Sequence, residues 1–155
     1  MKAWFVTKRL AFGSAITTWQ HVEQLQALGI THVINLRHGK HGKKIRQFKN
    51  LWLPFKDNDK PRPGWLYRRA LHFYQKAMRK PKSKLLCMCH HGKCRSASLA
   101  YFLLRVDGLS PARAKSTILK ARRSARIIPA YYRSGEDFLS LYKVQQFIKG
   151  KRSKS

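Results

Sequence analysis

The sequence predicts a single α/β domain in which a central, mainly parallel sheet is flanked by helices. The chain has 155 residues, the usual length of one domain. Hydrophobic residues make up 43% of it and aromatic residues 12%, a composition that is typical of a globular core. Short apolar runs also alternate with segments of helical periodicity. We expect the domain to span residues 1–148, followed by a frayed basic tail at residues 149–155.

Four short apolar segments have the length and composition of strands. They comprise residues 4–7, 32–36, 51–55 and 84–88. The first helix is expected at residues 17–28, where Trp19, Val22 and Leu25 recur at helical spacing and Gly29 ends the pattern.

Four further helices are expected after the third strand. Apolar residues repeat at helical spacing within residues 63–80 and again within residues 95–106. The pair Ser110-Pro111 is typical of an N-cap followed by proline in the first turn. Ser134 precedes two acids, which favours a last helix that begins there.

The charge is strongly one-sided. There are 34 Lys and Arg residues against 6 Asp and Glu, for a formal net charge of +28. Such a field attracts polyanions, so nucleic acid, an anionic membrane surface and phosphorylated molecules all fit as partners. A solvated surface is the simpler interpretation. Aromatic residues beside the basic runs either stack on bases or belong to the core: Phe48, Trp52, Tyr131 and Tyr132.

The cysteines indicate a reducing compartment. Cys87, Cys89 and Cys94 lie within one short segment, unlike the spaced disulfide framework of a small secreted protein. The first apolar stretch is broken by charged residues and is too short for a secretory signal. No stretch approaches the roughly 18 apolar residues of a membrane span. We therefore expect a cytoplasmic protein, or a nuclear one in a eukaryotic cell.

The segment after the fourth strand carries the chemistry. Residues 89–94 join that strand to a helix that begins near Arg95. Such loops present backbone N–H groups to an anion. Gly92 permits a tight bend, and the planar fork of Arg95 suits two phosphate oxygens. Thiols at helix N-termini ionise readily, so Cys89 is a candidate nucleophile, and Ser96 can donate a hydrogen bond to its thiolate.

The same cysteines allow two other interpretations. Cys89 taken alone fits a small buried hydrophobic residue at the end of a strand. A zinc site has a larger candidate set, namely Cys87, Cys89, His90, His91 and Cys94. Structural zinc sites usually take their ligands from two separated pairs, and no second cluster is present. The spacing Cys-x5-Arg-Ser therefore favours phosphate chemistry without a metal or cofactor.

The loop resembles the His-Cys-x5-Arg-Ser/Thr signature of the protein tyrosine phosphatase superfamily. RLAFGSAI (residues 9–16) and LGITHVINL (residues 28–36) resemble segments of its small dual-specificity branch. The resemblance covers about residues 8–142. It implies a phosphocysteine intermediate on Cys89, with Arg95 and the loop residues holding the phosphate. These loop residues are His90, His91, Gly92, Lys93 and Cys94. Met88 departs from the pattern, because the family has histidine there.

A general acid must protonate the leaving oxygen. Of the six acids, Asp57 and Asp59 lie in a turn-rich loop after a strand, and the others lie in or beside helices. Residues alone leave both open. The family's acid follows a "PF-x-D" strand end, which PFKD (residues 54–57) resembles, so the resemblance favours Asp57.

The resemblance implies phosphorylated proteins as substrates, with phosphotyrosine and also phosphoserine and phosphothreonine. Lys93 resembles the loop of phosphoinositide and inositol-polyphosphate phosphatases, and His91-Gly92 that of RNA 5′-triphosphatases. A non-catalytic protein that binds phosphate or nucleic acid is an alternative of another class. A rhodanese-like sulfur carrier is a third, although Arg95 and Ser96 favour phosphate.

Two further features of the sequence are the cysteines near Cys89 and the arginines that follow it. A disulfide from Cys89 to Cys87 or Cys94 is one way to protect an oxidised nucleophile. Three arginines of the 113–126 basic run are candidates for a second phosphate pocket at the mouth of the site, or else are exposed helix charges: Arg122, Arg123 and Arg126.

Overall fold

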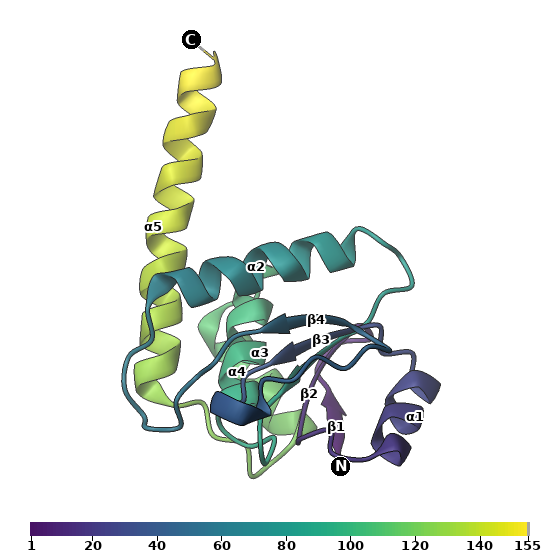
Figure 1. Ribbon diagram of the computed structural model, residues 1–155. Helices are drawn as coiled ribbons and strands as arrows, with labels where there is room; N and C mark the ends of the chain where they lie inside the picture. Colours follow the sequence, from purple (N-terminus) through teal and green to yellow (C-terminus); the bar gives the residue numbers. More distant parts are fainter. Residues whose placement is uncertain (155) are drawn as a thin grey trace.

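The computed structural model describes residues 1–154 (Figure 1). Its strands are β1 (Ala3–Phe5), β2 (Leu10–Gly13), β3 (His32–Asn35), β4 (Lys49–Trp52) and β5 (Leu85–Met88). Its helices are α1 (Trp19–Ala27), α2 (Gly64–Met78), α3 (Arg95–Val106), α4 (Pro111–Ala121) and α5 (Pro129–Lys154), with a short 3₁₀ helix η1 (Gly39–His41).

The five strands form one sheet in the order β1-β2-β5-β3-β4. Only β1 runs antiparallel to its neighbour, and the other three pairings are parallel. The predicted α/β domain with a mainly parallel sheet is therefore confirmed. Parallel pairing brings the carboxyl ends of β2, β3, β4 and β5 to one edge, where ligands bind in open α/β sheets.

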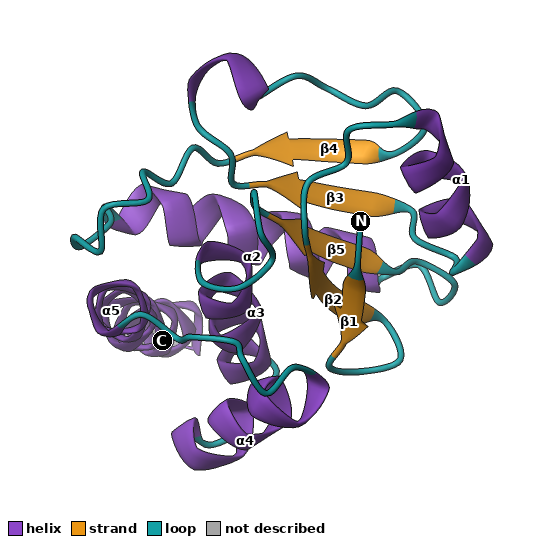
Figure 2. Cartoon of the chain, turned by 90° about the horizontal axis from the view of Figure 1, so that it is seen from below, coloured by secondary structure: helices purple, strands orange, loops and turns teal. Residues whose placement is uncertain are grey.

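The sheet has a core on each face. Alternate residues of the inner strands point to opposite sides, so Cys87 packs toward α2, α3 and α5 while Leu86 and Met88 pack toward α1. Figure 2 shows α1 on one side of the sheet and α3, α4 and α5 on the other. Helix α3 is buried along nearly its whole length, which fixes the helix that follows residues 89–94.

The helix starts follow their capping residues, with one correction. The Thr18 hydroxyl accepts from the His21 amide at the start of α1, and the Ser110 hydroxyl accepts from the Arg113 amide at the start of α4. The prediction that the last helix begins at Ser134 is wrong. Helix α5 begins at Pro129, whose fixed φ suits a first helical residue. The Ser134 hydroxyl instead donates to the Ala130 carbonyl one turn earlier.

The other differences concern strands and the tail. Strand β2 was not predicted, and β4 begins at Lys49 and ends before Pro54, which has no N–H to donate to a sheet.

Helix α5 continues without a break to Lys154 and stands out from the body of the domain, so residues 149–154 are helical rather than frayed (Figure 1). Ser155 lies outside the described residues. No helix within residues 1–154 has the length and apolar character needed to cross a bilayer.

Candidate active site

The predicted nucleophile lies at the carboxyl edge of the sheet. Cys89 directly follows β5, and its backbone N–H donates to the Gly13 carbonyl at the end of β2 across 3.2 Å. Its side chain is only 3% exposed. The sulfur therefore lies at the floor of a pocket that the ends of neighbouring strands surround.

In the catalytic loop, residues 89–95, the carbonyl groups of residues 90–93 accept hydrogen bonds from outside the loop. The His90 carbonyl accepts from the Ala15 amide at 3.1 Å, and the Lys93 carbonyl accepts from the Arg126 amide at 2.9 Å. The carbonyls of His91 and Gly92 both accept from the Arg122 guanidinium. Within residues 1–154, no hydrogen bond was found in which a backbone N–H of residues 90–94 is the donor. These N–H groups therefore remain available to the anion that the sequence predicts here.

Gly92 lets this loop approach β2 closely. Its φ of +66° is in the left-handed region. A Cβ at this position would lie 2.5 Å from the Gly13 carbonyl carbon and 2.6 Å from the Ser14 nitrogen. No other residue fits this conformation and this distance together. Glycine is therefore required here by the path of the loop.

Arg95 ties the loop to the ends of β3 and β4. Its Nη1 donates to the Leu36 carbonyl at 3.3 Å and to the Phe55 carbonyl at 3.0 Å. Its Nε lies 4.0 Å from Asp57 Oδ1. The guanidinium is thus fixed in position by backbone groups while one side of it lines a cavity of about 330 Å³ together with Cys89 and Asp57.

Ser96 lies in the first turn of α3, directly behind the nucleophile. Its Oγ accepts a hydrogen bond from the Cys89 thiol across 3.2 Å, and the direction can reverse once the sulfur is a thiolate. The Ser96 side chain is fully buried, so this contact is shielded from water. A hydroxyl in this place stabilises a thiolate by donating to it.

The structure separates the two candidate acids. Asp57 lines the cavity that contains Cys89, and its side chain is 61% exposed. Asp59 lines a different cavity together with Arg126. Asp59 also has a φ of +55°, as expected for a turn residue. Of the two candidate acids, Asp57 is therefore the one that shares a cavity with Cys89.

A buried tyrosine holds the loop that carries Asp57. The Tyr131 hydroxyl donates to the Lys56 carbonyl at 2.8 Å and accepts from the amides of Asn58 and Asp59. The sequence leaves Phe48 and Tyr131 open as base-stacking or core residues, and the structure buries both. Tyr131 is in addition an anchor for this loop. Its role as an anchor depends on a contact more than seventy positions away in sequence, which no local pattern reveals.

The remaining loop residues line the site from several sides. His91, Lys93 and Cys94 face the same cavity as Cys89, whereas His90 faces an adjoining one. The pKa of His90 is lowered by burial and by the charges of His91, Arg37 and Arg95. The catalytic loop therefore lies in a strongly positive environment.

The other two cysteines differ in their placement. Cys87 lies inside β5 within the core, and burial raises the pKa of its thiol. Cys94 shares the cavity with Cys89, and burial raises its pKa although Arg126 and Lys93 oppose the shift. No group of three or more His, Cys, Asp or Glu side chains in the described part of the chain is arranged to hold a metal. Met88 packs into the core on the α1 side of the sheet.

Arg122 is the one of the three predicted rim arginines that lines the cavity with Cys89. Its guanidinium lies 4.1 Å from the centroid of the Trp4 ring, which itself stacks on Phe12. Its Nη1 donates to the His91 carbonyl at 3.0 Å. Arg122 therefore links the catalytic loop to Trp4, because it contacts both the indole ring and two loop carbonyls.

Comparisons with known proteins agree with this fold. A family model described as "Swiss Army Knife protein, DSP-PTPase phosphatase domain" matches residues 1–135. The human tyrosine phosphatase-like serine/threonine/tyrosine-interacting protein superposes with a TM-score of 0.78 at 19% identity, covering 90% of this chain and 97% of that one. A mouse putative dual specificity phosphatase, complexed with zinc tungstate, gives 0.78 at 22% identity, with 93% and 90% covered.

A third solved structure, PTPMT1 in complex with PI(5)P, superposes with a TM-score of 0.76 at 15% identity. It covers 91% of this chain and 96% of that chain. Identities at this level establish a shared fold. The family match ends inside α5, so the distal part of that helix lies beyond the matched region.

Replacing Arg122 tests its role in the loop. We expect Arg122→Ala to lower kcat/KM on an aryl phosphate by about 10–100-fold, because hydrogen bonds to a charged group contribute about 1.5–3 kcal/mol. Arg122→Lys keeps the charge but loses the planar fork, so it should recover little of the activity. Arg123→Ala is the matched control, since this neighbour is exposed. Equal losses in Arg122→Ala and Arg123→Ala would show that only the overall charge matters.

Proposed function

Because this chain belongs to the family of DSP-PTPase phosphatase domains and is therefore a cysteine-dependent phosphatase, we propose that it hydrolyses phosphomonoesters of proteins through a phosphocysteine intermediate. Phosphotyrosine is the main substrate class in this proposal, and phosphoserine and phosphothreonine are further ones. The observation that carries it is the buried Cys89 sulfur at the floor of a cavity that Arg95 and the loop N–H groups surround.

Binding of the phosphate uses charges and dipoles that are already in place. The N–H groups of residues 90–94 and the start of α3 face the anion, and Arg95 offers a fixed fork. Since Arg95 is anchored on two backbone carbonyls, little reorganisation is needed when the phosphate arrives. The bound phosphorus then lies above Cys89.

In the first step the Cys89 thiolate attacks phosphorus. A sulfur–phosphorus bond forms and the ester phosphorus–oxygen bond breaks. Asp57 gives its proton to the leaving oxygen, so the alcohol or phenol departs neutral. Arg95 and the loop N–H groups stabilise the charge on the equatorial oxygens.

In the second step water attacks the phosphocysteine. Asp57, now a carboxylate, takes a proton from that water as the sulfur–phosphorus bond breaks. Inorganic phosphate leaves and the Cys89 thiolate is restored. Ser96, at 3.2 Å from the sulfur, donates a hydrogen bond that stabilises this leaving thiolate.

The protein-substrate part of the proposal is supported by the solved structures of similar fold, which include a putative dual specificity phosphatase and a tyrosine phosphatase-like protein. A second candidate is a phosphoinositide. It is favoured by Lys93, which lines the cavity with Cys89, and by the similarity in fold to PTPMT1 in complex with PI(5)P. A panel of phosphotyrosine peptide, phosphothreonine peptide, phosphoinositide and 5′-triphosphate RNA at several salt concentrations distinguishes these substrates.

Cys89→Ser separates an enzyme from a binding protein. We expect this variant to lose all measurable turnover of an aryl phosphate, because the serine hydroxyl is a far weaker nucleophile than the thiolate. It should still bind a phosphotyrosine peptide in a calorimetric titration, since Arg95 and the loop N–H groups remain. Cys87→Ser is the control and should remain active. Turnover by Cys89→Ser equal to that of the unmodified chain would refute the mechanism.

Paired substitutions identify the general acid. Asp57→Asn should lower the single-turnover rate on an alkyl phosphate by about 10²–10⁴-fold, because the poor leaving group needs a proton. The loss should be smaller on an aryl phosphate, whose phenol leaves more easily. Asp59→Asn, in the same loop but facing another cavity, is the matched control and should keep most of the rate. The assignment fails if Asp59→Asn shows the larger loss.

A further inference from the structure

A second cavity, of about 520 Å³, adjoins the one that contains Cys89. The two cavities share three lining residues, Asp57, His91 and Arg95. A molecule whose phosphate lies above Cys89 therefore has a neighbouring space within reach. Nothing in the hydrolytic mechanism uses this space.

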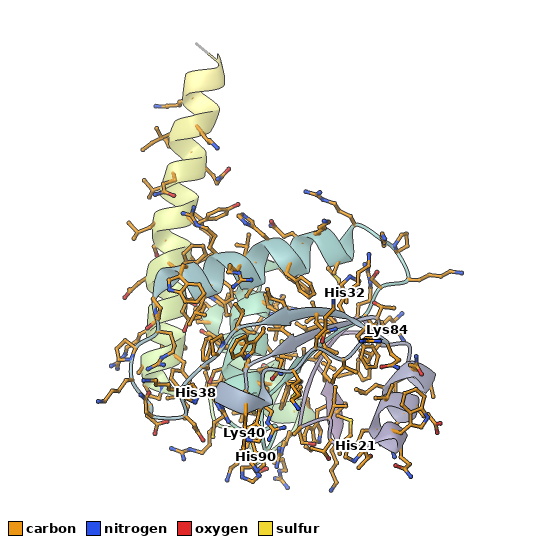
Figure 3. The ribbon with its side chains drawn as sticks, viewed as in Figure 1. His21, His32, His38, Lys40, Lys84 and His90 are labelled. Carbon is orange, nitrogen blue, oxygen red and sulfur yellow. The ribbon has the colours of Figure 1, made fainter. Side chains whose placement is uncertain are left out.

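The second cavity is lined almost entirely by basic and imidazole side chains. Besides the shared residues, these are Arg37, His38, His41, Lys56 and His90. Asp57 is the one carboxylate in this lining, and the mechanism above already employs it. Figure 3 shows His38, Lys40 and His90 on one side of the domain, apart from His32 and Lys84. Concave surfaces with one sign of charge concentrate ions of the opposite sign.

The segment that carries Arg37, His38 and His41 is held in place by a buried side-chain amide. Asn35, at the end of β3, is 4% exposed. Its Nδ2 donates to the His41 carbonyl at 2.9 Å, and its Oδ1 accepts from the Arg37 amide at 2.9 Å. One side chain thus fixes both ends of the segment from Arg37 to His41.

Trp52 and His90 add two further supports. The Trp52 indole donates to the Arg37 carbonyl at 2.7 Å, and a Cβ on Gly42 would lie 2.2 Å from the indole ring. Arg37 Nη2 lies 3.2 Å from His90 Nδ1, so the guanidinium touches the catalytic loop. This segment is therefore built onto the active site rather than being a freely solvated basic run.

The positive charges around this cavity disfavour protonation of its histidines. The pKa of His41 is lowered by desolvation and by the charges of Arg37, Lys40 and His90. The pKa of His90 is lowered by burial and by His91, Arg37 and Arg95, with Asp57 acting in the other direction. An anion placed among these groups offsets the surrounding positive charge and favours the protonated form of the imidazoles.

We propose that this cavity is a subsite for a second phosphate group of the same substrate molecule, held by Arg37 with His38 and His41. The proposal rests on the proposed function, because the first phosphate occupies the cavity of Cys89. It defines the preferred substrate class as molecules with two phosphates close together. A doubly phosphorylated peptide and a small polyol bisphosphate share this chemistry, and the experiment distinguishes them.

The test measures dissociation constants in the Cys89→Ser background, where binding does not depend on turnover. One ligand pair is a peptide with one or with two neighbouring phosphates, and the other is an inositol with one or two. Since each charge-assisted contact contributes about 1.5–3 kcal/mol, we expect the second phosphate to tighten binding about 10–100-fold in one of the pairs. The pair that shows the larger gain identifies the carrier.

Substitutions in the segment from Arg37 to His41 show whether the affinity gain from the second phosphate arises in this cavity. Arg37→Ala, and His38→Ala combined with His41→Ala, should reduce the affinity gain from the second phosphate to about threefold or less, by loss of these contacts. Lys40→Ala combined with Lys43→Ala removes the same amount of charge or more from exposed positions outside the cavity. This control should leave the gain intact.

Two outcomes would overturn the subsite. One is equal affinity for the singly and doubly phosphorylated ligands of both pairs, and the other is the same loss of gain in the Lys40→Ala, Lys43→Ala control. Failure of the proposed function looks different. In that case the chain with Cys89 intact does not turn over any phosphomonoester, while the Cys89→Ser variant still shows the affinity gain.

Discussion

The orientation of the peptide groups between Cys89 and Arg95 is the constraint on which the rest of the site depends. If their carbonyls faced inward, the pocket would repel a phosphate. The fold prevents this by giving the carbonyls of residues 90–93 partners outside the loop: the Ala15 amide, the Arg126 amide and the Arg122 guanidinium. The N–H dipoles of the same peptide groups are thereby left for an anion, and such preorganised dipoles need little rearrangement when it binds.

The sheet topology supplies the rest of the geometry. Parallel strands bring the end of β2 beneath Cys89 and the ends of β3 and β4 beneath Arg95, whose Nη1 joins the carbonyls of Leu36 and Phe55. The Asp57 loop is held from the helical side by the Tyr131 hydroxyl. Cys89 and Arg95 therefore follow β5 and Asp57 follows β4, and hydrogen bonds to backbone atoms hold these segments, which tolerates sequence change elsewhere.

The local part of this site could be predicted from the sequence because its chemistry is contiguous. Cys89, Gly92, Arg95 and Ser96 lie in one strand–loop–helix segment whose spacing is informative by itself. The contribution of Arg122 through Trp4, the anchoring by Tyr131 and the cavity around Arg37 could not be predicted in the same way. These depend on contacts between segments far apart in sequence. The start of α5 could not be predicted from Ser134, because the Ser134 hydroxyl donates to the Ala130 carbonyl inside the helix and does not cap its first turn.

Rapid-quench mass spectrometry of the enzyme during turnover of an aryl phosphate detects the phosphocysteine itself. We expect a phosphoryl group on the peptide that contains Cys89, formed within the first turnover and lost as phosphate is released. A phosphoryl group on His90 or His91, or turnover with no phosphorylated enzyme at any time, would contradict this mechanism.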